Sequence, residues 1–276
     1  MIKKTVTKKK KAAPKKAKSA AVRFDFAPEI VAETDDYLVI NKPAGVAVHG
    51  GGNLKEPTLA DWLIARYPKI KKVGDDPARP GLVHRLDKDV SGLMVIAKTS
   101  ASFEDLKNQF KDREVNKEYV ALVHGRIAKD EGTIDFPITR SQAGYKMAAL
   151  PAGAEALLTR RSPQGRDQGN IAGWFKSRAA LTHFSVLQRF VNYTLLRVSI
   201  KTGRTHQIRV HFFAYGYPLV GDDLYRNKKS KLRNQKLKLG RVFLVADRLS
   251  FRDRAGKTQE FSALLPAALQ AVLPKH

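Results

Sequence analysis

The predicted β-strands of this 276-residue chain arrive in consecutive runs, with few helices between them. The clearest run is a hairpin, in which residues 182–190 and 193–201 form two strands joined by the two-residue link Val191-Asn192. Runs of strands without regular helical crossovers argue against an array of strand–helix–strand units. The sequence therefore predicts an α+β fold, with a mixed, mostly antiparallel sheet and flanking helices.

Apolar runs and helical spacing predict the other elements. The expected strands are two within 30–40, then 93–97, 117–127, 241–251 and 258–261, and the expected helices are 59–67, one capped by Ser102, 204–215 and 266–272. Two polar segments, 153–178 and 226–241, lack periodicity and are expected to be long loops. The second segment carries eight cations and no acid, and both segments are suited to contact phosphate groups.

The balance of charge favours a polyanionic partner. Lysine and arginine total 51 against 26 aspartate and glutamate residues, a formal net charge of +25. A protein gains little from such self-repulsion unless a polyanion offsets it, and nucleic acid is the first candidate. Residues 1–22 hold nine lysines and no acid, which predicts a disordered basic arm that either contacts nucleic acid or only solubilises the chain. Removing nine from +25 still leaves residues 23–276 with +16.

Several classes of protein are disfavoured by patterns that the sequence lacks. Without cysteine there are no disulfides, thiolate metal sites or cysteine nucleophiles. No run of about 18 apolar residues predicts a membrane span, and a cytoplasmic location is expected. His206 and His211 would diverge by about 140° on a helix, and no HExxH motif occurs, so no metal site is expected. No GxSxG motif supports a serine hydrolase.

Asp87 and Asp89 are the candidate reactive carboxylates. They lie beside Arg85 and Lys88, in a segment that ends just before the expected buried strand at 93–97. An aspartate in such a place is either a turn former or a nucleophile or base, and the turn former is the commoner case. Composition and spacing alone leave this choice open.

Four segments, taken in order, resemble the motifs of one enzyme family. The segment GLVHRLDKDVSGL at 81–93 resembles the HRLDxxTSG signature of the RluA-type pseudouridine synthases. The segments INKPAG at 40–45, KEY at 117–119 and TGRTHQIRVH at 202–211 are similar to three further motifs of that family. The resemblance runs over residues 30–271 and implies an enzyme that isomerises uridines within RNA.

The chain departs from the family pattern in three places. Val90 replaces the threonine of the signature, and the segment 153–178 is longer than expected. Many relatives carry an S4 RNA-binding module before the catalytic domain, whereas here only the arm at 1–22 precedes a catalytic domain at 23–276. These departures leave the chemistry in place and concern the RNA target.

The resemblance implies a role for each of four residues. Asp87 is the nucleophile, attacking C1′ of the ribose or C6 of the uracil ring, and no cofactor is needed. Its charge must persist in a pocket that excludes water, so an opposing cation is required, and Arg209 matches that position. Tyr119 corresponds to the tyrosine that packs on the target base and is a candidate acceptor of the C5 proton. Arg85 matches the arginine that fills the place left by a flipped-out uridine.

RNA is the expected partner of a monomeric enzyme. Phosphate contacts are expected from Lys42, Arg204 and the segment 226–241. The segments VHGGGN, GLVHRLDKD and YPLVGDDLY resemble those of the family branches that act on large-subunit ribosomal RNA. Transfer RNA is the alternative substrate. Two other classes stay open, a catalytically silent RNA-binding factor for ribosome assembly and a metal-independent hydrolase that uses Asp87.

Overall fold

The computed structural model describes residues 24–51, 54–141, 144, 146–151 and 177–273. The basic arm expected at 1–22 and nearly all of the expected loop at 153–178 lie outside the described residues. Within the described ranges, no helix is long and apolar enough to cross a membrane.

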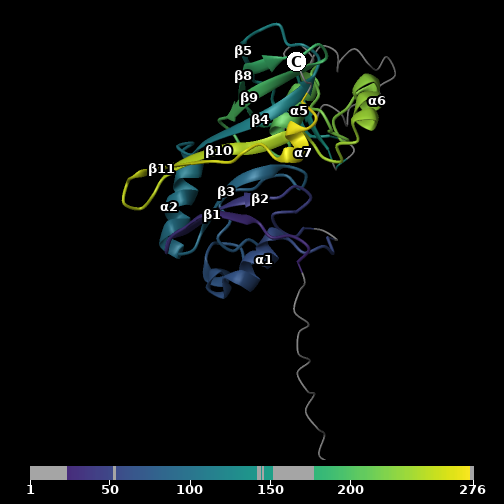
Figure 1. The fold of residues 1–276 in the computed structure, drawn as a ribbon. Coiled ribbons are helices and arrows are strands. Elements are labelled where there is room, and N and C mark those ends of the chain that lie inside the picture. Colours follow the sequence, from purple (N-terminus) through teal and green to yellow (C-terminus); the bar gives the residue numbers. More distant parts are fainter. Residues whose placement is uncertain (1–23, 52–53, 142–143, 145, 152–176, 274–276) are drawn as a thin grey trace, which may run out of the picture.

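A nine-stranded sheet runs through the molecule (Figure 1). Its order is β1 (Glu29–Glu33), β2 (Tyr37–Lys42), β3 (Ser91–Ala97), β10 (Leu244–Arg252), β4 (Asn116–His124), β9 (Tyr193–Ile200), β8 (Thr182–Arg189) and β5 (Glu131–Ile134), with β11 (Thr258–Ser262) paired to β10. Only β3 and β10 pair in parallel, and the other pairs are antiparallel. The short strands β6 (Ile138–Arg140) and β7 (Met147–Ala149) form a second sheet. The predicted α+β fold is confirmed.

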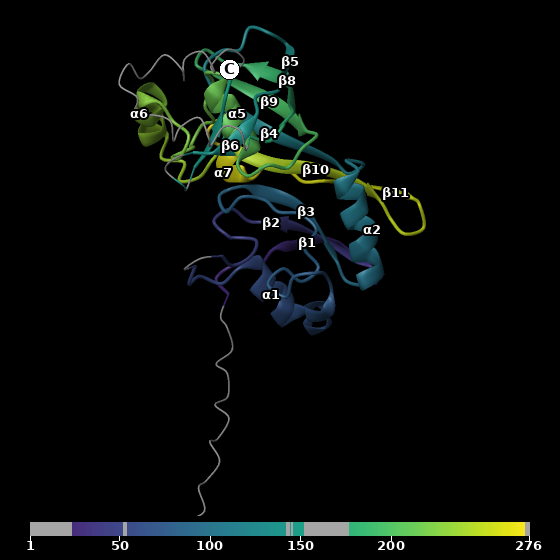
Figure 2. The same cartoon turned by 180° about the vertical axis from the view of Figure 1, so that it is seen from behind.

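Helices cover both halves of the large sheet (Figures 1 and 2). The helices are α1 (Leu59–Arg66), the 3₁₀ helix η1 (Pro68–Lys72), α2 (Ser100–Lys111), α5 (Gln207–Ala214), α6 (Lys228–Leu237) and α7 (Ala267–Gln270). In both views α1 lies with β1, β2 and β3, whereas α5 and α6 lie with β4, β9 and β8. The strand β10 runs between these two halves, so the junction of β3 with β10 determines how they meet.

A glycine allows the close approach of β3 to β10. Gly92 pairs with Ala246 and has a φ of +128°, in the region that favours glycine. A Cβ atom added at Gly92 would lie 2.2 Å from the carbonyl oxygen of Ala246, which no side chain tolerates. Gly92, the last residue of the 84–92 segment, therefore has a structural role, because it lets β3 pair closely with β10 directly after the loop that contains Asp87.

The prediction of a long loop at 226–241 is wrong over most of that segment, because α6 occupies residues Lys228–Leu237. Asn227 and Ser230 form a capping box, in which each side chain accepts a hydrogen bond from the backbone N–H of the other residue, at 2.8 and 3.0 Å. The sequence of α6 is polar and rich in lysine and has no apolar stripe, so hydrophobic periodicity does not predict this helix. The capping box is the local signal that predicts it.

Two expected helix starts also differ from the structure. The cap of α2 is Thr99, whose Oγ1 accepts a hydrogen bond from the N–H of Ser102 at 3.2 Å, whereas Ser102 itself is helical. The helix α5 begins at Gln207, three residues after the expected start, because His206 adopts a left-handed φ of +55°. Such a residue cannot continue a right-handed helix, so the segment before α5 is a turn.

Candidate active site

Asp87 lies in a loop that apolar packing and hydrogen bonds hold in place. Its neighbours Leu86 and Val90 are buried in the main core. The N–H of Gly45 donates to the carbonyl of Lys88 at 2.8 Å, which ties the loop to the segment after β2. Val90 fills the family's threonine position with an apolar side chain in that core. The Asp87 side chain is 16% exposed and lines a cavity.

Lys42 is fully buried, so the expected phosphate contact of Lys42 is wrong. Its ammonium donates to the carbonyls of Pro43, Val46 and Lys88, at 2.8, 2.8 and 3.2 Å. These acceptors engage all three donors of an ammonium group. Burial lowers the pKa of Lys42 to about 7, although the charge of Asp87 opposes this shift. Lys42 therefore links β2 to the Asp87 loop from within the protein.

Arg209 contacts two carboxylates at once. Its Nε and Nη2 donate to Asp222 at 2.7 and 2.9 Å, and its Nη1 lies 3.4 Å from Oδ2 of Asp87. Burial alone would lower the pKa of Arg209, but Asp222 and Asp87 together raise it above its ordinary value. The structure thus places a charged guanidinium beside Asp87, where the sequence predicted the opposing cation.

Asp222 anchors this arrangement, and sequence patterns do not single it out. It is 1% exposed, and its Oδ1 also accepts hydrogen bonds from the N–H groups of Leu224 and Tyr225, both at 2.9 Å. A carboxylate with this many donors holds its position without a ligand. The segment YPLVGDDLY contains two adjacent acids, and only the fold distinguishes buried Asp222 from exposed Asp223.

His206 and Tyr225 are further site residues that no motif identified as catalytic. His206 Nδ1 and the Tyr225 hydroxyl lie 3.0 Å apart, and His206 Nε2 is 4.0 Å from Oδ2 of Asp87. Burial lowers the pKa of His206, against the attraction of Asp87. The ring of Tyr225 packs 5.4 Å from Cζ of Arg209. Arg209, at 3.4 Å, lies closer to Asp87 than His206 does.

One cavity brings five of the six predicted site residues together. Its volume is about 80 Å³, and its walls include Asp87, Tyr119, Arg209, Arg85 and Arg204. These side chains come from the loop before β3, from β4, and from α5 with the turn before it. Burial, assisted by the charge of Asp87, raises the pKa of Tyr119 above its ordinary value. A neutral phenol is better suited to packing on a base than to removing a proton.

Arg85 and Arg204 lie on this cavity without a carboxylate partner among the described residues. Arg85 is exposed, with Nη1 3.4 Å from Nε2 of His49. Nε of Arg204 donates to the carbonyl of Ala179 at 3.3 Å. Within the same described ranges, no group of three or more His, Asp or Glu side chains could hold a metal ion.

Comparison with known sequences identifies the family. Residues 36–214 match the family model described as RNA pseudouridylate synthase. The chain is 42% identical over 235 residues to an uncharacterized RNA pseudouridine synthase of Chloroflexus aurantiacus, covering 84% of this chain and 64% of that protein. It is 36% identical over 255 residues to the ribosomal large subunit pseudouridine synthase D of Buchnera aphidicola, covering 90% and 73%. The chain thus spans less than two thirds of the Chloroflexus relative's length.

Solved structures agree with this identification. Human RNA Pseudouridylate Synthase Domain Containing 1 matches with a TM-score of 0.65 at 25% identity, over 88% of this chain and 87% of that chain. Human RNA Pseudouridylate Synthase Domain Containing 4 matches with a TM-score of 0.60 at 26% identity, over 88% and 90%. Family model, sequence relatives and fold point the same way, and this chain belongs to the RNA pseudouridylate synthase family, in its RluA type.

Proposed function

We propose that this protein is an RNA pseudouridine synthase, which isomerises selected uridines within a folded RNA. The observation that carries the proposal is the single cavity in which Asp87, Tyr119 and Arg209 meet, each at a position of a family motif. Binding RNA without chemistry would not need a buried cation between two carboxylates. This arrangement disfavours a catalytically silent RNA-binding factor.

In this proposal the Asp87 carboxylate is the nucleophile. It attacks C1′ of the ribose or C6 of the ring, and the C1′–N1 bond breaks. The uracil turns, a C1′–C5 bond forms, C5 loses a proton and N1 gains one, and Asp87 is released. The product is an isomer of the substrate, so the reaction needs no oxidant, reductant or second substrate. Arg209 keeps Asp87 charged, and Tyr119 packs on the uracil.

The target uridine must leave its stack to reach Asp87, because the cavity walls are largely buried groups. Arg85 is exposed at this cavity, and its planar guanidinium can stack on bases while it donates to phosphate. We assign Arg85 to the place that the flipped uridine leaves. Arg204 is assigned to a phosphate of the same strand.

Large-subunit ribosomal RNA is the proposed substrate class, with a cytoplasmic site of action. Relatives from four bacteria named ribosomal large subunit pseudouridine synthase D are 36–42% identical to this chain. The formal charge of +25 suits a large polyanion of this kind. Transfer RNA remains the alternative substrate, and the experiment below separates the two.

The test is pseudouridine mapping across total RNA from cells with the gene, without it, and with the Asp87→Asn variant restored. The proposal expects one or a few pseudouridines to vanish on deletion, to return with the wild-type gene and to stay absent with the variant. Lost sites in transfer RNA instead of ribosomal RNA would change the substrate class. An unchanged map after deletion would contradict the proposed activity.

A further inference from the structure

A second cavity adjoins the candidate active site. Its volume is about 370 Å³, and it shares the wall residues Arg85, Lys117, Gly203 and Arg204 with the cavity that contains Asp87. When an RNA strand places one nucleotide at Asp87, the strand continues on both sides of that nucleotide, and each neighbouring nucleotide carries a phosphate group. The adjoining cavity is therefore open to the part of the strand next to the target.

The second cavity concentrates unpaired positive charge. Its lining residues, all of them described by the structure, include six cations and no aspartate or glutamate. The six are Arg85, Lys111, Arg113, Lys117, Lys201 and Arg204. None of them forms an ion pair with a carboxylate of the described residues, whereas Lys107, Arg189 and Arg254 elsewhere on the surface do.

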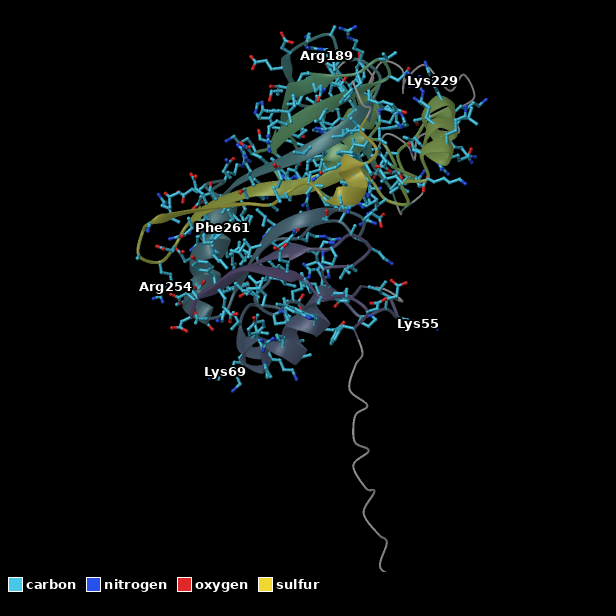
Figure 3. All side chains as sticks on the ribbon, viewed as in Figure 1. Lys55, Lys69, Arg189, Lys229, Arg254 and Phe261 are labelled. Atoms are coloured by element: carbon cyan, nitrogen blue, oxygen red, sulfur yellow. The ribbon has the colours of Figure 1, made fainter. Side chains whose placement is uncertain are left out.

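This concentration distinguishes the cavity from the general basic surface. Cations such as Lys55, Lys69, Lys229 and Arg254 lie at widely separated points of the periphery (Figure 3). Positive charge spread in this way attracts RNA but selects no path for the strand. Six cations around one hollow beside Asp87 do select a path.

Lys117 is only partly exposed. It lies on β4, two residues before Tyr119, and its ammonium packs 5.0 Å from the centre of the Phe110 ring. Burial lowers the pKa of Lys117 to about 8, as expected for a cation that lacks a counter-charge. A Cβ atom built at Gly203 would lie 4.0 Å from Nζ of Lys117, so the absence of a side chain at Gly203 leaves room beside the ammonium.

The remaining wall favours a phosphate over a stacked base as the occupant. Phe110 already stacks on His84, with ring centres 4.6 Å apart, and also contacts Lys117. Nε2 of His84 accepts the N–H of Val95 at 3.1 Å, and burial lowers the pKa of His84 to about 3, so this ring is neutral. The aromatic groups therefore support Lys117, and the cations are left to bind the ligand.

We propose that Lys117 and the cations around it bind a phosphodiester group of the RNA strand adjacent to the target uridine. The inference rests on the proposed function, since it takes RNA as the ligand. Because Lys117 and Tyr119 share one strand two residues apart, a phosphate held at Lys117 positions its nucleotide relative to the base that packs on Tyr119. The cavity then orients the strand as well as attracting it.

The test measures binding of large-subunit ribosomal RNA, transcribed in vitro, to variants that also carry Asp87→Asn so that no turnover occurs. Lys117→Met should weaken binding about tenfold near pH 7, the effect of losing one charge-assisted hydrogen bond. It should also reduce the slope of log affinity against log salt by roughly 0.7. Lys117→Arg should restore both quantities, and Lys69→Met, an exposed cation far from the cavity, is the matched control.

Each outcome separates this inference from the proposed function. If the wild-type protein, with Asp87 intact, neither binds nor modifies the RNA, the proposed function fails. If it does both and Lys117→Met binds equally well with an unchanged salt slope, only the phosphate site is overturned. Should Lys117→Met fail to fold, Lys201→Met decides, because Lys201 is exposed at the same cavity. An unchanged salt slope in that variant would equally contradict the site.

Discussion

The two adjoining cavities differ in how their cations are paired: Arg209 lines only the cavity with Asp87 and contacts carboxylates, whereas Arg85, Lys117 and Arg204, which line both cavities, contact none among the described residues. In the candidate active site, Arg209 is hydrogen-bonded to Asp222 and lies 3.4 Å from Asp87, so its charge is neutralised within the protein. In the second cavity, six cations face one hollow without a carboxylate among its lining residues. The first arrangement holds its geometry before any substrate arrives, whereas the second reaches electrical balance only when an anion binds.

In the proposed function, this difference separates the residues that act in catalysis from those that capture the substrate. Changes in the paired cavity should lower turnover or destabilise the fold, because they leave a buried charge or polar group unpaired. Changes in the unpaired cavity and at the periphery should alter RNA affinity and its salt dependence, with little effect on folding. The predictions below test this division from the largest expected effect to the smallest.

Asp222→Asn should lower turnover by about 100-fold, the scale expected when a group that positions the nucleophile's counter-charge is misplaced. The variant halves the negative charge around Arg209 and weakens the bidentate contact. Asp223→Asn is the matched control, because Asp223 is 78% exposed and pairs with Arg226 on the surface. Single-turnover kinetics on saturating RNA measure both variants. Equal rates for the two would show that the buried pair has no catalytic importance.

Lys42→Met should lower the free energy of unfolding by about 3 kcal/mol, since the three carbonyls that accept hydrogen bonds from its buried ammonium lose their donor. Lys88→Met, which removes an exposed lysine paired with Glu56, should change it by less than about 0.5 kcal/mol. Urea denaturation compares the two variants. If Lys42→Met is as stable as the wild type but binds RNA more weakly, Lys42 contacts phosphate after all, and the structural role proposed here is wrong.

Deleting residues 1–22 should weaken RNA binding at low salt without changing which uridine is modified. The nine lysines of this segment supply charge but no pattern for reading bases. The loss should shrink as salt rises, with roughly 0.7 lost from the salt slope for each lysine that meets a phosphate. A salt titration with pseudouridine mapping tests this expectation. A changed set of modified uridines would make the arm a determinant of specificity.

The smallest predicted effect is a dependence of RNA affinity on pH. Only protonated Lys117 attracts phosphate, so affinity should fall severalfold between pH 7 and pH 9, as the pH passes its pKa of about 8. The charged and titratable groups that line the two cavities with Lys117 are His84, Arg85, Lys111, Arg113, Lys201 and Arg204 in the second cavity, and Asp87, Tyr119, His206 and Arg209 with Arg85 and Arg204 in the candidate active site. Lys117→Arg should remove most of this fall, because arginine stays charged throughout the range. An identical fall in both proteins would assign it to another group.

Most of the site could be predicted because four segments resemble motifs of a known family, and the fold brings these segments together. The 84–92 segment precedes β3, residues 117–119 lie on β4, and 202–211 leads into α5, so Asp87, Tyr119 and Arg209 converge once the sheet forms. Without that resemblance, local patterns leave Asp87 as either a turn former or a nucleophile.

Other parts of the site depend on contacts between distant segments and could not be predicted. The partner of Arg209 lies thirteen residues away in a turn, and an aspartate pair there gives no sign of which member is buried. Lys42 donates a hydrogen bond to the carbonyl of Lys88 in the Asp87 loop, and these two residues are 46 positions apart in the sequence. A lysine within an apolar strand is ordinarily assigned to the surface, and only the fold reveals the three acceptors around it.

The most direct test of the account is Asp87→Asn, measured as pseudouridine formed on the RNA substrate in a single turnover. Asparagine is nearly isosteric with aspartate but cannot form the covalent adduct, so the account predicts a loss of at least about 1000-fold, or roughly 4 kcal/mol in the barrier, with RNA binding retained. Asp89→Asn, two residues away and exposed, should stay within about threefold of the wild type. Activity of Asp87→Asn within about tenfold of the wild type, a difference of roughly 1.4 kcal/mol, would contradict the central claim.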